Sequence, residues 1–193
     1  MRKSHFLVIA ALGSLTTGAF AHSGHDASMP FMSGFLHPMM GFDHLIAMFA
    51  VGLWGARLGG KAIFAAPFAF VATMIMGFSL AIAGMNIPYI EQGIIASVIF
   101  LGLVLAFSAR LPLVFSSGLV AIFAFFHGAA HGMELPSDAH ATGFAMGFAL
   151  ASIAFHLAGV LFNKAIAPLN QILVSRMTGS LIALSGLFLA LGA

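Results

Sequence analysis

Long apolar stretches separated by short polar breaks dominate this sequence. From residue 36 onward six such stretches follow one another, each about 20 residues long, which is the length that a helix needs to cross a bilayer. The breaks carry residues typical of turns, such as Gly59-Gly60, Asn86-Ile87-Pro88 and Pro136-Ser137-Asp138. The pattern therefore predicts six membrane-spanning helices, at about 36–56, 62–84, 92–109, 111–134, 141–162 and 172–191.

The composition of the chain supports this prediction. Of its 193 residues 61% are hydrophobic and only 6% are charged, whereas about a quarter of a soluble domain is charged. The six stretches also fill most of the chain after residue 36, which leaves no room for an extramembrane domain. We predict an all-α membrane protein in which residues 36–193 form one bundle of six transmembrane helices. With no cysteine, the chain has no disulfide and no thiolate metal ligand.

The first 21 residues have the features of a cleavable signal peptide. Arg2 and Lys3 precede a short apolar run at 6–15, and Ala19-Phe20-Ala21 forms an A-x-A cleavage site. Cleavage there leaves residues 22–35 as an outer, periplasmic N-terminal tail. An uncleaved first helix is the alternative.

The basic side chains give the orientation of the bundle. Apart from Arg2 and Lys3, they all lie near the ends of the first, third and fifth predicted spans or in the loops that follow, and they are Arg57, Lys61, Arg110, Lys164 and Arg176. Basic residues collect on the cytoplasmic side of membrane proteins. We therefore expect a multi-pass protein of the bacterial cytoplasmic membrane, with its mature N-terminus and its C-terminus outside. Because five acidic residues balance these five cations and no basic stripe exists, nucleic-acid binding is excluded.

The first predicted span opens with a stripe of metal-binding residue types. Residues at i, i+4, i+7 and i+11 share one helix face, and here they are His37, Gly41, His44 and Met48. Asp43 lies about a quarter turn from this stripe. Two imidazoles and a carboxylate, with a glycine that leaves space for an ion, could form half of a metal site.

The fourth predicted span ends with a second group of this kind. His127, His131 and Glu134 follow at i, i+4 and i+7, which again is one face of a helix. Histidines at i and i+4 commonly bind a transition metal together. Because one span enters from outside and the other returns there, His44 and His127 should both lie about 12 Å below the outer boundary.

These two groups together predict a cation site within the membrane. Polar groups that only hold helices together are the alternative, but charged groups in lipid cost several kcal/mol and usually serve a function. The predicted metal-binding residues are His37, Asp43, His44, His127, His131 and Glu134. Imidazole and carboxylate ligands without thiolate favour nickel, cobalt, zinc or copper(II) over magnesium or calcium, and nearby methionines keep copper(I) open.

Four further residues are candidates for metal capture or transit. His22 and His25 lie in the outer tail, where the new amino terminus could add a ligand. Met48 lies near the predicted site, and His156 lies alone and deeper in the fifth span, where a packing role is the alternative.

Both motifs resemble those of the HupE/UreJ family. The resemblance rests on His37-Pro-x-x-Gly41-x-Asp43-His44-x-x-Ala47-Met48 with the following Val51-Gly52-Leu53-Trp54, and on Phe126-His127-Gly128-x-Ala130-His131-Gly132-x-Glu134. It covers the whole chain, including the signal peptide. It implies a nickel or cobalt permease, often linked to the nickel supply of hydrogenase or urease. The separate nickel/cobalt transporter family has one residue fewer between its first histidine and the aspartate, so its details are not transferred.

The sequence thus predicts uptake of a divalent metal, nickel with cobalt as competitor, by facilitated diffusion or by coupling to an ion gradient. The metal is the substrate, and no catalytic residue and no permanent cofactor are expected. Two alternatives stay open: a membrane-embedded metalloenzyme that uses the same cluster, and a metal sensor or maturation partner. The oligomeric state also stays open.

Overall fold

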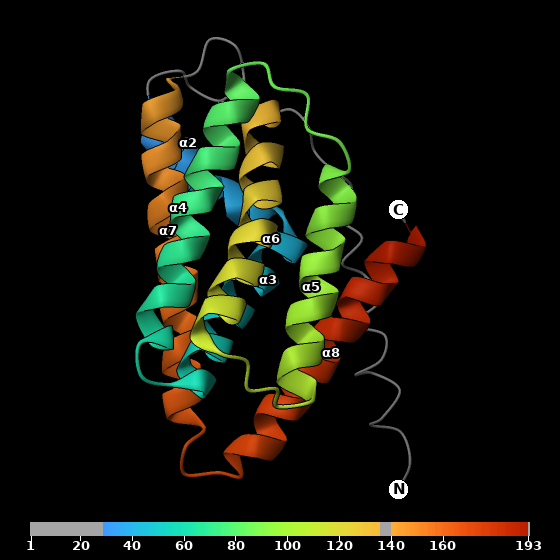
Figure 1. Ribbon diagram of the computed structural model, residues 1–193. Coiled ribbons are helices and arrows are strands. Elements are labelled where there is room, and N and C mark those ends of the chain that lie inside the picture. Colours follow the sequence, from blue (N-terminus) through green and yellow to red (C-terminus); the bar gives the residue numbers. More distant parts are fainter. Residues whose placement is uncertain (1–28, 136–139, 193) are drawn as a thin grey trace, which may run out of the picture.

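A computed structural model describes residues 29–135 and 140–192 of the protein (Figure 1). Within these residues all regular structure is helical. The elements are α2 Pro30–Leu36, the 3₁₀ helix η1 His37–Met40, α3 Phe42–Leu58, α4 Ala62–Ile82, α5 Ile90–Ala106, α6 Leu113–Glu134, α7 Ala141–Ala165 and α8 Gln171–Gly192. The predicted signal peptide, and His22 and His25 of the tail, lie outside the described residues.

The described helices fit a multi-pass membrane protein. Four of them, α4, α6, α7 and α8, are long and apolar enough to cross a bilayer, and α2 to α3 make a fifth if the bent segment is one span. At 17 residues the apolar α5 is shorter, about 25 Å long. Large apolar side chains cover the outer surface, among them Phe64, Phe68, Leu157, Leu181 and Phe188. A surface of this kind is suited to contact with lipid rather than with water.

The prediction of one continuous first helix from 36 to 56 is wrong. The chain bends by 88° between Pro30–Met40 and Phe42–Leu58. Gly41 lies at the bend with extended backbone angles, φ −103° and ψ 107°. His37 therefore precedes the bend, and it does not share one helix face with His44 and Met48.

Helix α2 forms in residues that the sequence pattern assigns to the outer tail. It packs against the first turns of α7, and glycines make the contact close. A Cβ on Gly34 would collide with the Phe144 carbonyl, and one on Gly147 would collide with the carbonyl of Phe31. The short helix is thus held by a partner more than 100 residues away in the sequence, which local periodicity does not reveal.

The longer helices pair through similar contacts: α4 packs on α6, α5 on α8, and α3 on α7. The Gly128 backbone lies against the Met74 carbonyl, and Gly52 lies against the backbone of His156. These approaches bring α3, α4, α6 and α7 together around the interior, whereas α8 lies at the edge beside α5 (Figure 1).

The five described Lys and Arg residues lie in the last turns of α3 and α7, in the loops after α3 and α5, and near the start of α8; these parts of the chain are at the lower end in Figure 1. Helices α3, α5 and α7 end there, and α4, α6 and α8 begin there. Helix α6 ends with Glu134 at the opposite end. The basic residues therefore lie at one end of the bundle, and Glu134 of the predicted site lies at the other.

Candidate metal-binding site

The structure brings the two sequence motifs into contact. His44, in the first turn of α3, has its ring 4.6 Å from the ring of His127 and 4.4 Å from that of His131, between centroids. His37 of η1 lies 4.7 Å from His131. The four imidazoles thus form a connected row, His37–His131–His44–His127. The bend at Gly41 turns His37 toward the end of α6, so the contact forms without a continuous first helix.

Glu134 connects His37 and His131, the first two histidines of this row. Its Oε2 atom accepts a hydrogen bond from His37 Nε2 at 3.0 Å and lies 3.4 Å from His131 Nδ1. His37, His131 and Glu134 each offer one ligand atom, and the three atoms lie within 4.8 Å of one another. A divalent metal bound at about 2.1 Å to its ligands holds neighbouring ligand atoms about 3.0–3.4 Å apart. Two of the distances in this group, 3.0 Å and 3.4 Å, fall in that range; we call the group the outer triad, after the orientation expected from the sequence.

Asp43 orients His44. Its Oδ1 atom accepts hydrogen bonds from the backbone N–H of His44 and from its ring Nδ1, both at 2.8 Å. Because Nδ1 carries the proton, Nε2 keeps its lone pair, and this atom is buried without a hydrogen-bond partner. Carboxylates commonly hold metal-binding histidines in this way.

Ser97 of α5 is a polar neighbour that sequence reasoning missed. Its Oγ atom lies 2.8 Å from Nε2 of His127, and both residues are completely buried. The available signal was a serine among apolar residues in the stretch Ile94–Leu105. A serine within a helix can donate its hydroxyl hydrogen to a backbone carbonyl of the preceding turn. Its presence in an apolar stretch therefore did not by itself indicate a contact with the site.

Aromatic rings lie along one side of the cluster, whereas the Glu134 side chain is 59% exposed. Phe148 lies 4.2 Å from His131 and Phe144 lies 5.2 Å from His37, between ring centroids. Inside such an apolar wall a charge interacts more strongly with its ligands than in water. An ion that reached these histidines would therefore need their nitrogen atoms to replace its water ligands.

The other predicted residues lie apart from this row. His156 of α7 is buried, and neither ring nitrogen has a hydrogen-bond partner. Phe70 of α4 contacts both His156 and His127, with centroid distances of 4.9 Å and 5.6 Å. Met48 is fully buried in the apolar core.

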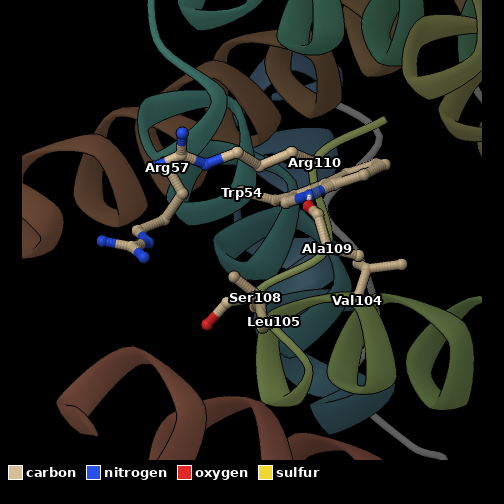
Figure 2. Close-up of a pocket in the computed structure, with 7 residues that line it drawn as sticks. All are labelled: Trp54, Arg57, Val104, Leu105, Ser108, Ala109 and Arg110. Carbon is tan, nitrogen blue, oxygen red and sulfur yellow. Dashed lines mark hydrogen bonds between the residues drawn. The ribbon is translucent and has the colours of Figure 1, made fainter. Parts of the chain in front are cut away.

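A small cavity lies at the opposite end of α3, where Trp54, Arg57 and Arg110 line it (Figure 2). Its volume is about 10 Å³, enough for roughly one water molecule. Trp54 closes one side and donates a hydrogen bond to the carbonyl of Ala109 at 3.2 Å. This cavity belongs to the basic end of the bundle and does not contact the histidine row.

Fold and site together define a helical, multi-pass membrane protein with a histidine and carboxylate cluster in its interior. Residues 9–189 match the family described as HupE / UreJ protein, and the chain belongs to this family. It is 38% identical to Protein HupE of Rhizobium leguminosarum bv. viciae, over the full length of both chains. No solved structure matches the chain.

Proposed function

We propose that this protein carries a divalent transition metal, nickel with cobalt as competitor, inward across the bacterial cytoplasmic membrane. Its family is associated with nickel and cobalt transport or supply. The metal is substrate rather than a resident cofactor, and the receiving enzyme is a hydrogenase or a urease. In this proposal α5 and the bent α2–α3 segment also cross the bilayer, which makes six crossings.

One observation carries the proposal: four imidazoles and two carboxylates from distant parts of the chain meet in one cluster, which extends from the exposed Glu134 to the buried His44 and His127. Glu134 lies 3.0 Å from His37 and 3.4 Å from His131, and Asp43 holds His44. Uncompensated polar groups are costly in a membrane and commonly mark an ion path. Neutral imidazole with carboxylate suits nickel, cobalt and zinc better than magnesium or calcium.

The order of the ligands suggests a path for the ion. The outer triad captures it, helped by His22 and His25 of the tail. The ion then moves to His44 and on to His127, which is completely buried. His156 receives it on the inner side of Phe70, and the basic end of the bundle faces the cytoplasm.

Uptake of radioactive nickel into vesicles that contain the purified protein tests this function. We expect entry with the unaltered protein, competition by cobalt, and loss of at least 90% of entry with Asp43→Ala. That variant removes the carboxylate that holds His44. Repeating the experiment with a pH gradient separates facilitated diffusion from proton coupling.

His140→Ala is the matched control, because this histidine is exposed at the start of α7 and is not part of the row. It should take up nickel normally. Normal entry with a correctly inserted Asp43→Ala protein would contradict the proposed site. Tight nickel binding without entry would contradict transport and favour the metalloenzyme or sensor alternatives.

A further inference from the structure

Ser97 joins α5, which supplies no predicted ligand, to the histidine row. Its Oγ atom lies 2.6 Å from the carbonyl oxygen of Ile94 and 2.8 Å from Nε2 of His127. A hydroxyl has only one hydrogen to donate. Since a carbonyl oxygen can only accept, the hydroxyl hydrogen goes to Ile94, and Oγ accepts the hydrogen bond from Nε2–H of His127.

This hydrogen bond determines which nitrogen of His127 is free. With the proton on Nε2, the lone pair lies on Nδ1, and that atom is buried without a partner. His44 has the complementary arrangement, in which Asp43 accepts from Nδ1 and Nε2 is buried and free. The two rings are 4.6 Å apart, so both free nitrogens belong to neighbouring rings in one apolar space.

We propose that Ser97 is a positioning residue that holds His127 as its Nε2–H tautomer and so presents Nδ1 to the transported metal. This inference rests on the proposed function. It gives α5 a role in the site, because the Ser97 hydroxyl orients His127 in the same way that the Asp43 carboxylate orients His44. Partners of this kind fix the tautomer and the ring orientation of metal-binding histidines.

The variant Ser97→Ala tests the proposal. It removes the acceptor from Nε2–H and leaves every proposed ligand in place. We expect the dissociation constant for nickel to rise about 10- to 100-fold, as is typical when a partner of a ligand is lost. Titration of the purified protein in detergent measures this constant without any need for transport.

Ser152→Ala is the matched control. Ser152 is equally buried, but its Oγ atom lies 2.9 Å from the Phe148 carbonyl oxygen, to which it donates, and 3.4 Å from the sulfur of Met74. Removing this hydroxyl should disturb the packing as much as Ser97→Ala does, and it should leave the affinity for nickel unchanged. An equal loss of affinity in both variants would show a general packing effect and overturn the proposal.

Ring-nitrogen NMR of the metal-free protein, labelled at histidine, gives a second readout that a structural role would not change. The His127 signal, assigned with His127→Gln, should show the proton on Nε2 and should lose this preference in Ser97→Ala. A proton on Nδ1 in the unaltered protein would overturn the proposal. If the unaltered protein binds no nickel, the proposed function fails as well. If it binds nickel and Ser97→Ala binds equally well, only the role of Ser97 fails.

Discussion

Each imidazole of the row has one ring nitrogen beside an oxygen atom of another side chain. The oxygen atom belongs to Glu134 for both His37 and His131, to Asp43 for His44, and to Ser97 for His127. The other nitrogens of His44, His127 and His131 are buried without partners. Leaving a buried nitrogen unpaired costs about 1–3 kcal/mol. Under the proposed function, these nitrogens are the atoms that would bind the metal.

Gly41 gives a prediction at this scale. An added Cβ would lie 2.9 Å from Nδ1 of His44 and 3.0 Å from Oδ1 of Asp43. Both distances are shorter than ordinary van der Waals contact, so Gly41→Ala should displace the pair. Because the backbone angles of Gly41 suit alanine, the protein should still fold. We expect nickel uptake to fall at least tenfold, measured in vesicles.

Gly118→Ala is the control for this substitution. Gly118 lies in α6, and a Cβ there meets nothing within 4 Å. Alanine in a helix is about 0.5–1 kcal/mol more favourable than glycine, so this variant should be at least as stable and should transport normally. Undiminished uptake by Gly41→Ala would mean that the Asp43–His44 geometry does not limit transport.

The residues of the candidate site, including Asp43 and Glu134, could be predicted from the sequence, but the neighbours of His127 could not. His127, His131 and Glu134 share a helix face by spacing alone, and the structure has them on one helix. Ser97 and Phe70 contact His127 from α5 and α4, at separations that no local periodicity encodes. Only the packing of the bundle shows that a serine 30 residues away meets an imidazole.

At the scale of elements, hydropathy predicted the long helices well. The structure has α4, α6, α7 and α8 within about three residues of the predicted bounds. Each contains a continuous apolar stretch, so length and composition determine it. The first helix differs because two factors outweigh hydropathy: Gly41 adopts an extended conformation, and the glycines of α7 accommodate α2.

The bend at Gly41 also matters for the site. A straight helix from 36 to 56 would carry His37 and His44 about 10 Å apart along its axis. In the structure both rings contact His131, at 4.7 Å and 4.4 Å. The bend thus gathers two histidines that a regular helix would separate by two turns. Irregular backbone at membrane depth is tolerated only where it is buried in protein or lines a water-filled cavity.

The whole molecule has its basic residues at one end and the outer triad toward the other, which predicts a specific orientation. The chain contains no cysteine, so a single cysteine can report the side of the membrane. Met85 and Leu169 are exposed, at 50% and 62%, in the loops after α4 and α7. A membrane-impermeant maleimide should label Met85→Cys in intact cells, and label Leu169→Cys only after the cytoplasmic membrane is opened. The reverse pattern would place the triad on the cytoplasmic side and contradict uptake.

Transport through the whole molecule requires a step beyond the histidine row, and His156 offers one. The imidazole is 2% exposed, has no hydrogen-bond partner on either nitrogen, and contacts Phe70, which also contacts His127. A histidine that served packing alone would be expected to have a partner. We therefore expect His156→Leu to fold with an unchanged or higher midpoint of thermal unfolding, because it removes an unpaired polar group.

The same variant separates binding from passage. Because the row of four histidines is intact in His156→Leu, the dissociation constant for nickel should stay within about threefold, while the rate of entry falls at least tenfold. His140→Leu makes the same chemical change at an exposed position and should affect neither quantity. Normal entry through His156→Leu would mean that the ion passes elsewhere. Loss of binding as well as entry would mean that His156 supports the structure of the row, since an ion that follows the proposed path reaches His156 only after the row has bound it.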